Sequence, residues 1–256
     1  MGQHPATPKV VPTADDASTS LESLLQTKVV TASRFSEDLA DAPGVITVVS
    51  RDEINRMGGL TLREILSRVA GLDVTSNALT DRSMIAVRGD QAKANGVHVL
   101  FLINGRPTRE VVDGGAMSEL LEAFPIAILE RIEVIEGPGS VLYGSNAYSG
   151  VINLITRKAD GKSGAVRGFG SGVGPAGGSA EGLYRRGDFS LVAAVQFHQN
   201  ARWTTLVAPD LAPNGTFGPL SDYSLYDGSR GLFVEAGYKG FSAMVSNMAW
   251  RSVPVE

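Results

Sequence analysis

The stretch Arg131-Ile-Glu-Val-Ile-Glu-Gly-Pro-Gly-Ser-Val-Leu-Tyr-Gly-Ser-Asn-Ala-Tyr-Ser-Gly-Val-Ile-Asn-Leu-Ile-Thr-Arg-Lys158 places two apolar runs on either side of a glycine-rich turn. Ile132 and Val134 alternate with Arg131, Glu133 and Ile135, which predicts a half-buried strand. Gly137-Pro138-Gly139 must turn the chain, because proline fixes φ and glycine permits positive φ. Residues 151–155 then return as a second strand. Before this stretch the pattern is mixed α/β, and after it alternating strands dominate.

Composition limits the classes of function. With 256 residues, 43% of them hydrophobic, the chain is long enough for one large or two ordinary domains. A net charge of −4 argues against a nucleic-acid partner, which would need a basic face. The absence of cysteine excludes a disulfide framework, a zinc-cysteine cluster and a thiol nucleophile. Three scattered histidines predict no metal site, and no cofactor is predicted.

The N-terminal region carries two open questions. Residues 1–26 are predicted to be a disordered lead-in, since the first 20 are rich in Pro, Thr, Asp, Ser and Ala. No apolar signal-peptide core is present in residues 1–19, so a signal has been removed, the start differs, or the protein stays inside. The short β-prone patch Thr27-Lys28-Val29-Val30-Thr31-Ala32 fits either an edge strand or loop, or an extended peptide that adds to a partner's sheet.

The middle of the chain predicts a compact α/β unit of about 130 residues, an ordinary domain size. Ser50 with Glu53 forms a capping box at the start of one helix, and Thr61 with Glu64 forms another. A third helix is predicted over 117–124, where Pro125 stops it. Strands are predicted over 45–49, 72–75, 84–87 and 97–103.

Beyond residue 163 the sequence changes to alternating strands. Residues 189–198, 232–238 and 241–246 alternate clearly, while 165–173 and 178–186 are weaker and rich in glycine. Tight turns alternate with a long polar loop over 199–229. Strands of about ten residues with one apolar face are typical of an outer-membrane β-barrel, although a soluble β-sandwich also alternates.

No arrangement of residues predicts an enzyme. The sequence contains no P-loop, HExxH or Gly-x-Ser-x-Gly motif. Glu130, Glu133 and Glu136 suggest acid–base chemistry at first sight. Glu133 and Glu136 differ in strand parity, however, and surface charge or an ion pair with Arg131 explains them better.

Taken together, these stretches resemble the TonB-dependent receptors of Gram-negative outer membranes, of the colicin I and cobalamin receptor type. Residues 27–32 resemble the TonB box, and 45–54 resemble the opening of the plug domain. Residues 62–74, 85–89 and 99–105 resemble further plug motifs. Residues 131–158 match the family pattern nearly residue for residue.

The resemblance implies an α+β plug domain, with a mixed short sheet and small helices, followed by antiparallel β-strands of an incomplete transmembrane β-barrel. The implied segments are the lead-in 1–26, the TonB-box-like segment 27–32, the plug domain 33–160, and about the first five strands of a truncated barrel in 161–256. Because the family's barrel has 22 strands and an open sheet leaves unpaired edge groups in lipid, we expect the chain to be a fragment of a longer receptor.

The resemblance also implies transport and not catalysis. Such receptors take up a large scarce nutrient, such as an iron-siderophore, haem or cobalamin, across the outer membrane. TonB would pair with the coupling segment Thr27, Lys28, Val29, Val30, Thr31 and Ala32 on the periplasmic side, and outer-membrane lipid would surround the strands. Arg88, Arg131 and Glu133 are predicted to form a latch between plug and barrel. Alternatives are a soluble periplasmic plug-like module that binds a ligand or partner, and a soluble two-domain enzyme.

Overall fold

The computed structural model describes residues 28–31, 37–38, 44–77, 82–90, 96–111, 114–115, 117–170, 176–199, 203–204, 224–225 and 228–251. The predicted lead-in 1–26, together with Thr27 and Ala32 of the coupling segment, lies outside the described residues. The predicted loop over 199–229 also lies largely outside them.

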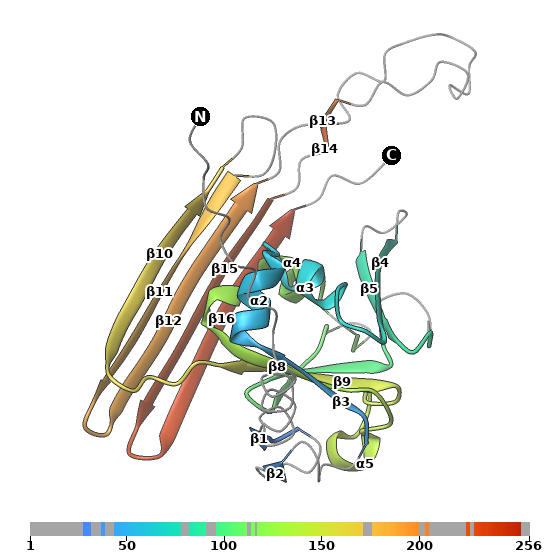
Figure 1. The fold of residues 1–256 in the computed structure, drawn as a ribbon, viewed down its shortest axis with the longest axis horizontal. Coiled ribbons are helices and arrows are strands. Elements are labelled where there is room, and N and C mark those ends of the chain that lie inside the picture. The colour runs from blue at the N-terminus through green and yellow to red at the C-terminus, as the bar shows by residue number, and fades with distance from the viewer. Residues whose placement is uncertain are drawn as a thin grey trace, which may run out of the picture.

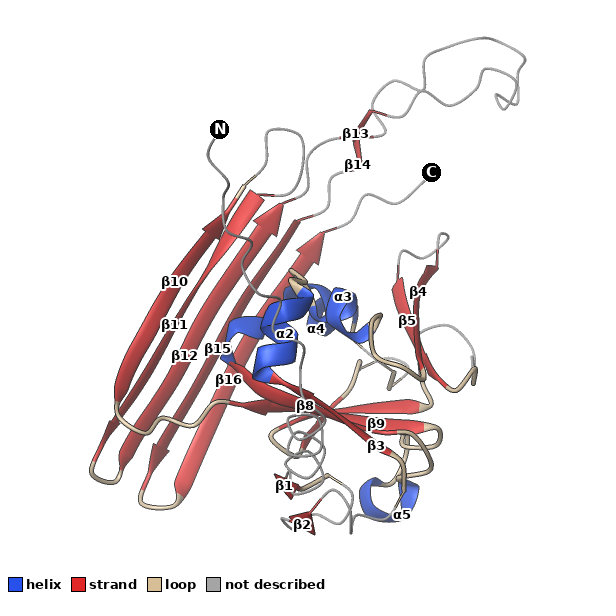
Figure 2. Cartoon of the chain, viewed as in Figure 1, coloured by secondary structure: helices blue, strands red, loops and turns tan. Residues whose placement is uncertain are grey.

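Short helices and two larger sheets make up the described part of the chain (Figures 1 and 2). The helices are α2 (Arg51–Met57), α3 (Leu62–Leu66), α4 (Ser118–Ala123), α5 (Ser140–Tyr143) and the 3-10 helix η1 (Ile126–Ile128). The strands of the first half are β1 (Lys28–Val29), β2 (Glu37–Asp38), β3 (Ile46–Ser50), β4 (Leu72–Asn77), β5 (Arg82–Val87), β6 (Val99–Ile103), β7 (Arg106–Thr108), β8 (Leu129–Ile135) and β9 (Gly150–Thr156). The strands of the second half are β10 (Lys162–Phe169), β11 (Ala176–Arg186), β12 (Phe189–Gln199), β13 (Trp203–Thr204), β14 (Ser224–Leu225), β15 (Gly228–Tyr238) and β16 (Phe241–Arg251).

The first sheet has the strand order β3-β8-β9-β6-β7, and β6 runs parallel to β9 while the other pairs are antiparallel. Helices α2, α3 and α4 cover one of its faces, where they build the main hydrophobic core. Local signals in the sequence start and stop these helices. The Ser50 and Glu53 side chains form the predicted capping box, and Gly58 ends α2 with a φ of 64°.

Strand β8 is buried on both faces, so the prediction of a half-buried strand was wrong. Ile132 and Val134 face the core under the helices. Ile135 packs on the other side, in a second cluster that includes Tyr143 of α5. Glu133 also lies on that second side and is fully buried. Alternation within β8 could not show this, because the segments that cover the second face come from elsewhere in the chain.

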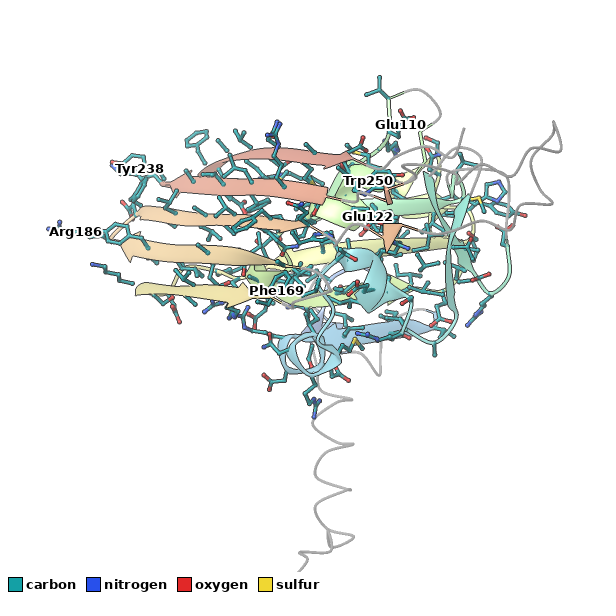
Figure 3. The ribbon with its side chains drawn as sticks, turned by 90° about the horizontal axis from the view of Figure 1, so that it is seen from above. Glu110, Glu122, Phe169, Arg186, Tyr238 and Trp250 are labelled. Atoms are coloured by element: carbon teal, nitrogen blue, oxygen red, sulfur yellow. The ribbon has the colours of Figure 1, made fainter. Side chains whose placement is uncertain are left out.

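The second sheet has the order β10-β11-β12-β15-β16, and all of its strands are antiparallel. One face packs against α4 and η1, and there Phe233 of β15 meets Phe124 at a ring distance of 5.9 Å. The opposite face carries apolar side chains that the chain leaves exposed, among them Phe197 at 59% and Phe241 at 84%. Figure 3 shows Tyr238 at one end of this sheet and Trp250 at the other. No helix in the described part of the chain is long and apolar enough to cross a membrane.

Candidate functional site

The segment from Lys28 to Thr31 is docked on the second face of the first sheet. Among the described strands, its strand β1 pairs with the short β2 alone, in the register Lys28 to Asp38 and Val29 to Glu37. Val29 and Thr31 are nevertheless fully buried. Contacts with side chains of β8, α5 and β9 therefore hold the segment in place.

Glu133 is the centre of this docking. Its Oε2 accepts hydrogen bonds from the backbone N–H of Val30 at 3.0 Å and of Thr31 at 2.9 Å, and from the Thr31 hydroxyl. Its Oε1 accepts from Arg131 Nε at 2.8 Å and forms an ion pair with Arg131 Nη2 at 2.7 Å. A buried carboxylate is tolerated only when it is paired and hydrogen-bonded, and Glu133 meets both conditions.

Two more side chains complete a pocket around Thr31, which we call the Thr31 socket and define as Glu133, Tyr143 and Asn153. The Tyr143 hydroxyl donates to the Thr31 carbonyl at 2.7 Å, and Asn153 Nδ2 donates to Thr31 Oγ1 at 3.0 Å. Asn153 Oδ1 in turn accepts from the backbone N–H of Gly105 at 3.1 Å. All polar atoms of Thr31 thus have partners in the socket.

The structure brings two groups of predicted site residues together. Val30 and Thr31 of the predicted coupling segment donate to Glu133 of the predicted latch, and Glu133 pairs with Arg131. The pairing of Glu133 with Arg131 was one of the two options that the sequence left open.

Arg88, the third predicted latch residue, lies apart from these residues. It pairs with Glu136 at 3.3 Å, beside the end of β8, and has a positive φ of 52°. The ion pairs of Arg88 and Arg131 therefore lie within the part of the chain formed by the first sheet and its helices, which we call the first unit. Their latch role stays a prediction.

Other residues form the polar contacts between the first unit and the second sheet, a boundary that we call the seam. Glu181 of β11 accepts from Arg51 at 3.3 Å and from Arg157 at 3.0 Å, both from the first unit. Arg167 of β10 reaches the same oxygen at 3.5 Å. The Glu181 side chain is almost completely buried, so its charge is balanced by guanidinium groups and not by water.

A second seam contact is centred on Glu235 of β15. Asn104 Nδ2 donates to Glu235 at 2.9 Å and to Thr156 Oγ1 at 2.8 Å, and Arg106 pairs with Glu235 at 3.6 Å. Asn104 and Gly105 have φ values of 50° and 76°, as a tight turn between β6 and β7 requires. Asn-Gly is a common sequence for such a turn, but sequence reasoning missed the contact of the Asn104 side chain with the second sheet.

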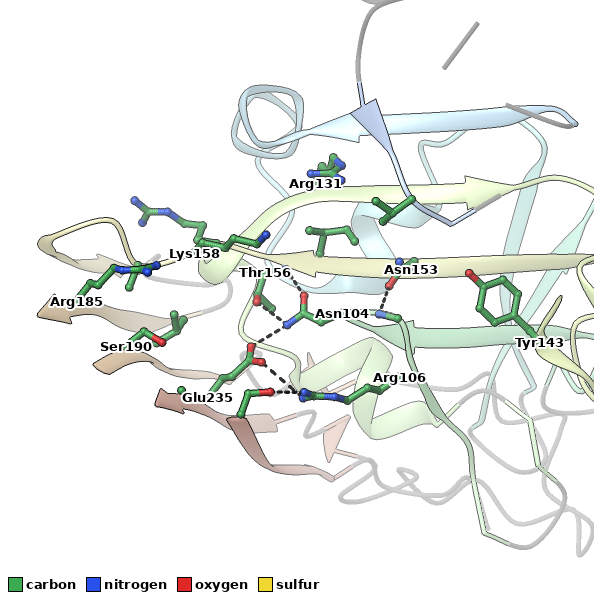
Figure 4. A pocket seen from close by; sticks show the side chains of 18 residues that line it. Asn104, Arg106, Arg131, Tyr143, Asn153, Thr156, Lys158, Arg185, Ser190 and Glu235 are labelled. Carbon is green, nitrogen blue, oxygen red and sulfur yellow. Dashed lines mark hydrogen bonds and ion pairs between the residues drawn. The ribbon is translucent and has the colours of Figure 1, made fainter. Parts of the chain in front are cut away.

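The seam also contains an open pocket of about 760 Å³, drawn in Figure 4. Both units contribute to its wall, together with Val30 of the docked segment. We call it the seam pocket. In the described residues no group of three or more His, Asp or Glu side chains is placed to hold a metal ion.

Comparison with known proteins agrees with this architecture. Residues 38–151 match the family model described as TonB-dependent Receptor Plug Domain. The vitamin B12 transporter BtuB of Vibrio vulnificus (strain CMCP6) is 37% identical over 147 residues, which cover 57% of this chain and 23% of that protein. The present chain thus spans about a quarter of the length of that relative.

Solved structures share the fold. The ferric enterobactin receptor PfeA of Pseudomonas aeruginosa aligns with a TM-score of 0.57 and 20% identity, over 88% of this chain and 35% of that one. The pyoverdine outer membrane receptor FpvA of Pseudomonas aeruginosa PAO1 aligns with a TM-score of 0.62 and 19% identity, over 86% of this chain and 29% of that one.

The chain therefore consists of a small α+β domain that lies against one face of an antiparallel sheet, and the opposite face of that sheet is apolar. Residues 38–151 match the TonB-dependent receptor plug domain, and the chain joins this region to strands that share the fold of those receptors. The predicted resemblance is confirmed. So is the predicted fold class, an α+β plug domain followed by antiparallel strands of an incomplete β-barrel.

Proposed function

We propose that this chain supplies the plug and first strands of an outer-membrane transporter for a large scarce nutrient, with Thr27 to Ala32 as the segment that TonB engages. The observation that carries the proposal is the docking of Val30 and Thr31 on the buried carboxylate of Glu133. The plug would lie inside the barrel with its N-terminus in the periplasm.

The docking chemistry supports a switchable contact. Strand addition requires the backbone N–H and C=O groups of the added segment. In the docked state two of those N–H groups donate to Glu133, and the Thr31 carbonyl accepts from Tyr143. TonB and the Thr31 socket would therefore compete for the same backbone groups. Undocking must precede or accompany capture of this segment.

The second sheet supports a membrane location over a free-standing plug-like module. Its outward face exposes Val166, Phe197, Phe241 and Val245 by 59–85%. An apolar face of this extent is costly in water and favourable against lipid. The relatives are a transporter and receptors, one for vitamin B12 and others for ferric enterobactin and pyoverdine. A large metal chelate is therefore the class of cargo that we propose, and no catalysis is proposed.

The test measures binding of the purified periplasmic domain of TonB to the chain and to a Val30→Pro variant. Proline lacks the N–H that a strand ladder needs, so binding should fall at least tenfold. The same substitution removes the hydrogen bond from Val30 to Glu133 and so favours undocking. If TonB did not pair with the backbone of this segment, the easier undocking of Val30→Pro would raise TonB binding instead of lowering it. Thr13→Pro, in the lead-in, is the control and should bind like the parent. Equal binding of Val30→Pro and the parent would refute the proposal.

A further inference from the structure

The seam pocket lies between the plug and the second sheet, beside the docked segment. Its walls come from the turn at Asn104, the ends of β8 and β9, and the ends of β11, β12, β15 and β16 near their short turns. A volume of about 760 Å³ lies within the range of small-molecule sites. The pocket is therefore large enough for a solute, and it extends past the Thr31 socket, with which it shares Tyr143 and Asn153.

Charge is distributed unevenly in this pocket. Five cationic side chains line it, whereas Glu235 is its single lining carboxylate. The cationic residues are Arg106, Arg131, Arg157, Lys158 and Arg185.

Three of the five cations already have a carboxylate partner. Arg131 pairs with Glu133, Arg157 with Glu181, and Arg106 with Glu235. The side chains of Lys158 and Arg185 have no ion-pair or hydrogen-bond partner in the part of the chain that the structure describes. Two positive charges of the pocket, those of Lys158 and Arg185, thus have no carboxylate partner in the described residues, in a chain whose net charge is −4.

Hydroxyl groups stand close to the two unpaired cations. Figure 4 shows Arg185, Lys158, Ser190 and Thr156 around the same part of the pocket. Thr156 Oγ1 accepts from Asn104, so its own O–H remains to donate. The single lining carboxylate, Glu235, is engaged by Asn104 and Arg106. Cations and hydroxyl donors together match the oxygen atoms of a phosphate or carboxylate.

We propose that the seam pocket binds an anionic group, a phosphate or a carboxylate, between Lys158 and Arg185. The volume exceeds what a lone phosphate fills, so the anion is one part of a larger solute. The further role of the pocket, as a place where an anionic cargo binds beside the plug during uptake, rests on the proposed transport function. Binding of the anion itself does not rest on that function.

Inorganic phosphate is the probe, titrated by calorimetry into the full 256-residue chain in a non-ionic detergent at constant ionic strength. We expect saturable binding with a Kd of about 1 mM, which corresponds to about −4 kcal/mol. Lys158→Gln and Arg185→Gln should each weaken binding about tenfold, because each removes one of the two unpaired charges.

Arg186→Gln is the matched control. Arg186 follows Arg185 on β11, so strand alternation directs it to the outer face, and Figure 3 shows it at the short-turn end of the sheet. It removes the same charge and should change the Kd less than twofold. If Arg185→Gln and Arg186→Gln weakened phosphate binding equally, the effect would come from the overall charge of the chain, and the proposal would be overturned. Absence of saturable binding to the parent chain would also overturn it.

A second arm separates a free anion from a lipid headgroup. The titration is repeated in nanodiscs of phosphatidylglycerol and of phosphatidylcholine. Equal phosphate affinity in both lipids supports a solute site. Competition by phosphatidylglycerol alone would assign the pocket to an anionic headgroup and overturn the solute assignment. TonB binding by the Lys158→Gln variant, measured as for Val30→Pro, reports separately on the proposed transport function.

Discussion

Replacing Glu133 with Gln should release the segment that contains Val30 and Thr31 from the plug. Glutamine keeps the shape of the side chain but carries no charge. Its carbonyl oxygen can still accept from the segment, but its NH₂ group then faces the Arg131 guanidinium, which is also a donor. The glutamine side chain can therefore satisfy either the docking contacts or the Arg131 contact, but not both.

The size of the effect follows from the contacts that are lost. Three donors of the segment converge on Glu133 Oε2, and hydrogen bonds to a charged group contribute about 1.5–3 kcal/mol each. Since the amide retains part of this interaction, we expect docking to weaken by about 3 kcal/mol, or on the order of a hundredfold in the docked-to-undocked ratio.

Thiol labelling measures this ratio directly, because the chain contains no cysteine. Val29 is fully buried in the docked state, so a Val29→Cys reporter reacts with a maleimide only after undocking. Adding Glu133→Gln should raise the labelling rate on the order of a hundredfold. Thr31→Val, which leaves the Glu133–Arg131 pair intact, should raise it about tenfold.

Glu130→Gln is the control for charge. Glu130 lies on the same strand β8 but is exposed, so its substitution should leave the labelling rate unchanged. A labelling rate in the Glu133→Gln variant within twofold of the reporter alone would refute the assignment of Glu133 as the docking residue. An equal increase with Glu130→Gln would refute it as well.

Three further substitutions and one control substitution test the seam by urea unfolding. Gly231→Ala would place a methyl group against the Ala123 carbonyl and should lower the free energy of unfolding by about 1–3 kcal/mol, whereas Gly182→Ala, with open space around it, should be close to neutral. Phe233→Ala removes a fully buried ring that packs on Phe124, and should cost about 3–5 kcal/mol; a loss below 1 kcal/mol would show that the two units do not share a core. Glu181→Gln leaves Arg51 and Arg157 without their carboxylate and should cost about 3 kcal/mol, and an unchanged midpoint would contradict a structural role for this cluster.

Local chemistry explains which features could be predicted from the sequence. The helix that Ser50 begins and Gly58 ends depends on hydrogen bonds between residues three or four apart, so a short window contains its signal. The same holds for the tight turn at Asn104-Gly105 and for the outward face of β12, where alternation alone places Val195 and Phe197.

Contacts between distant segments could not be predicted in this way. Glu133 meets Thr31 across 102 residues, and Asn104 meets Glu235 across 131. One signal was available for the seam, since Glu181 lies between Ser179 and Leu183 on the inward face of β11, and Glu235 interrupts an otherwise small or apolar inward face of β15. Such carboxylates indicate a buried polar partner, but the sequence does not say which arginine or asparagine supplies it.

The edge position of β3 has a mechanical consequence. Among the described strands β3 pairs only with β8, through five residue pairs, while β8 and β9 each have two neighbours. A pulling force applied at the N-terminus would reach the Thr31 socket first and β3 next. Once the socket yields, the load would act on a border strand that can peel away one pair at a time. The interior strands of the plug would keep their hydrogen-bonded pairing, so the domain would unfold under force from the β3 edge.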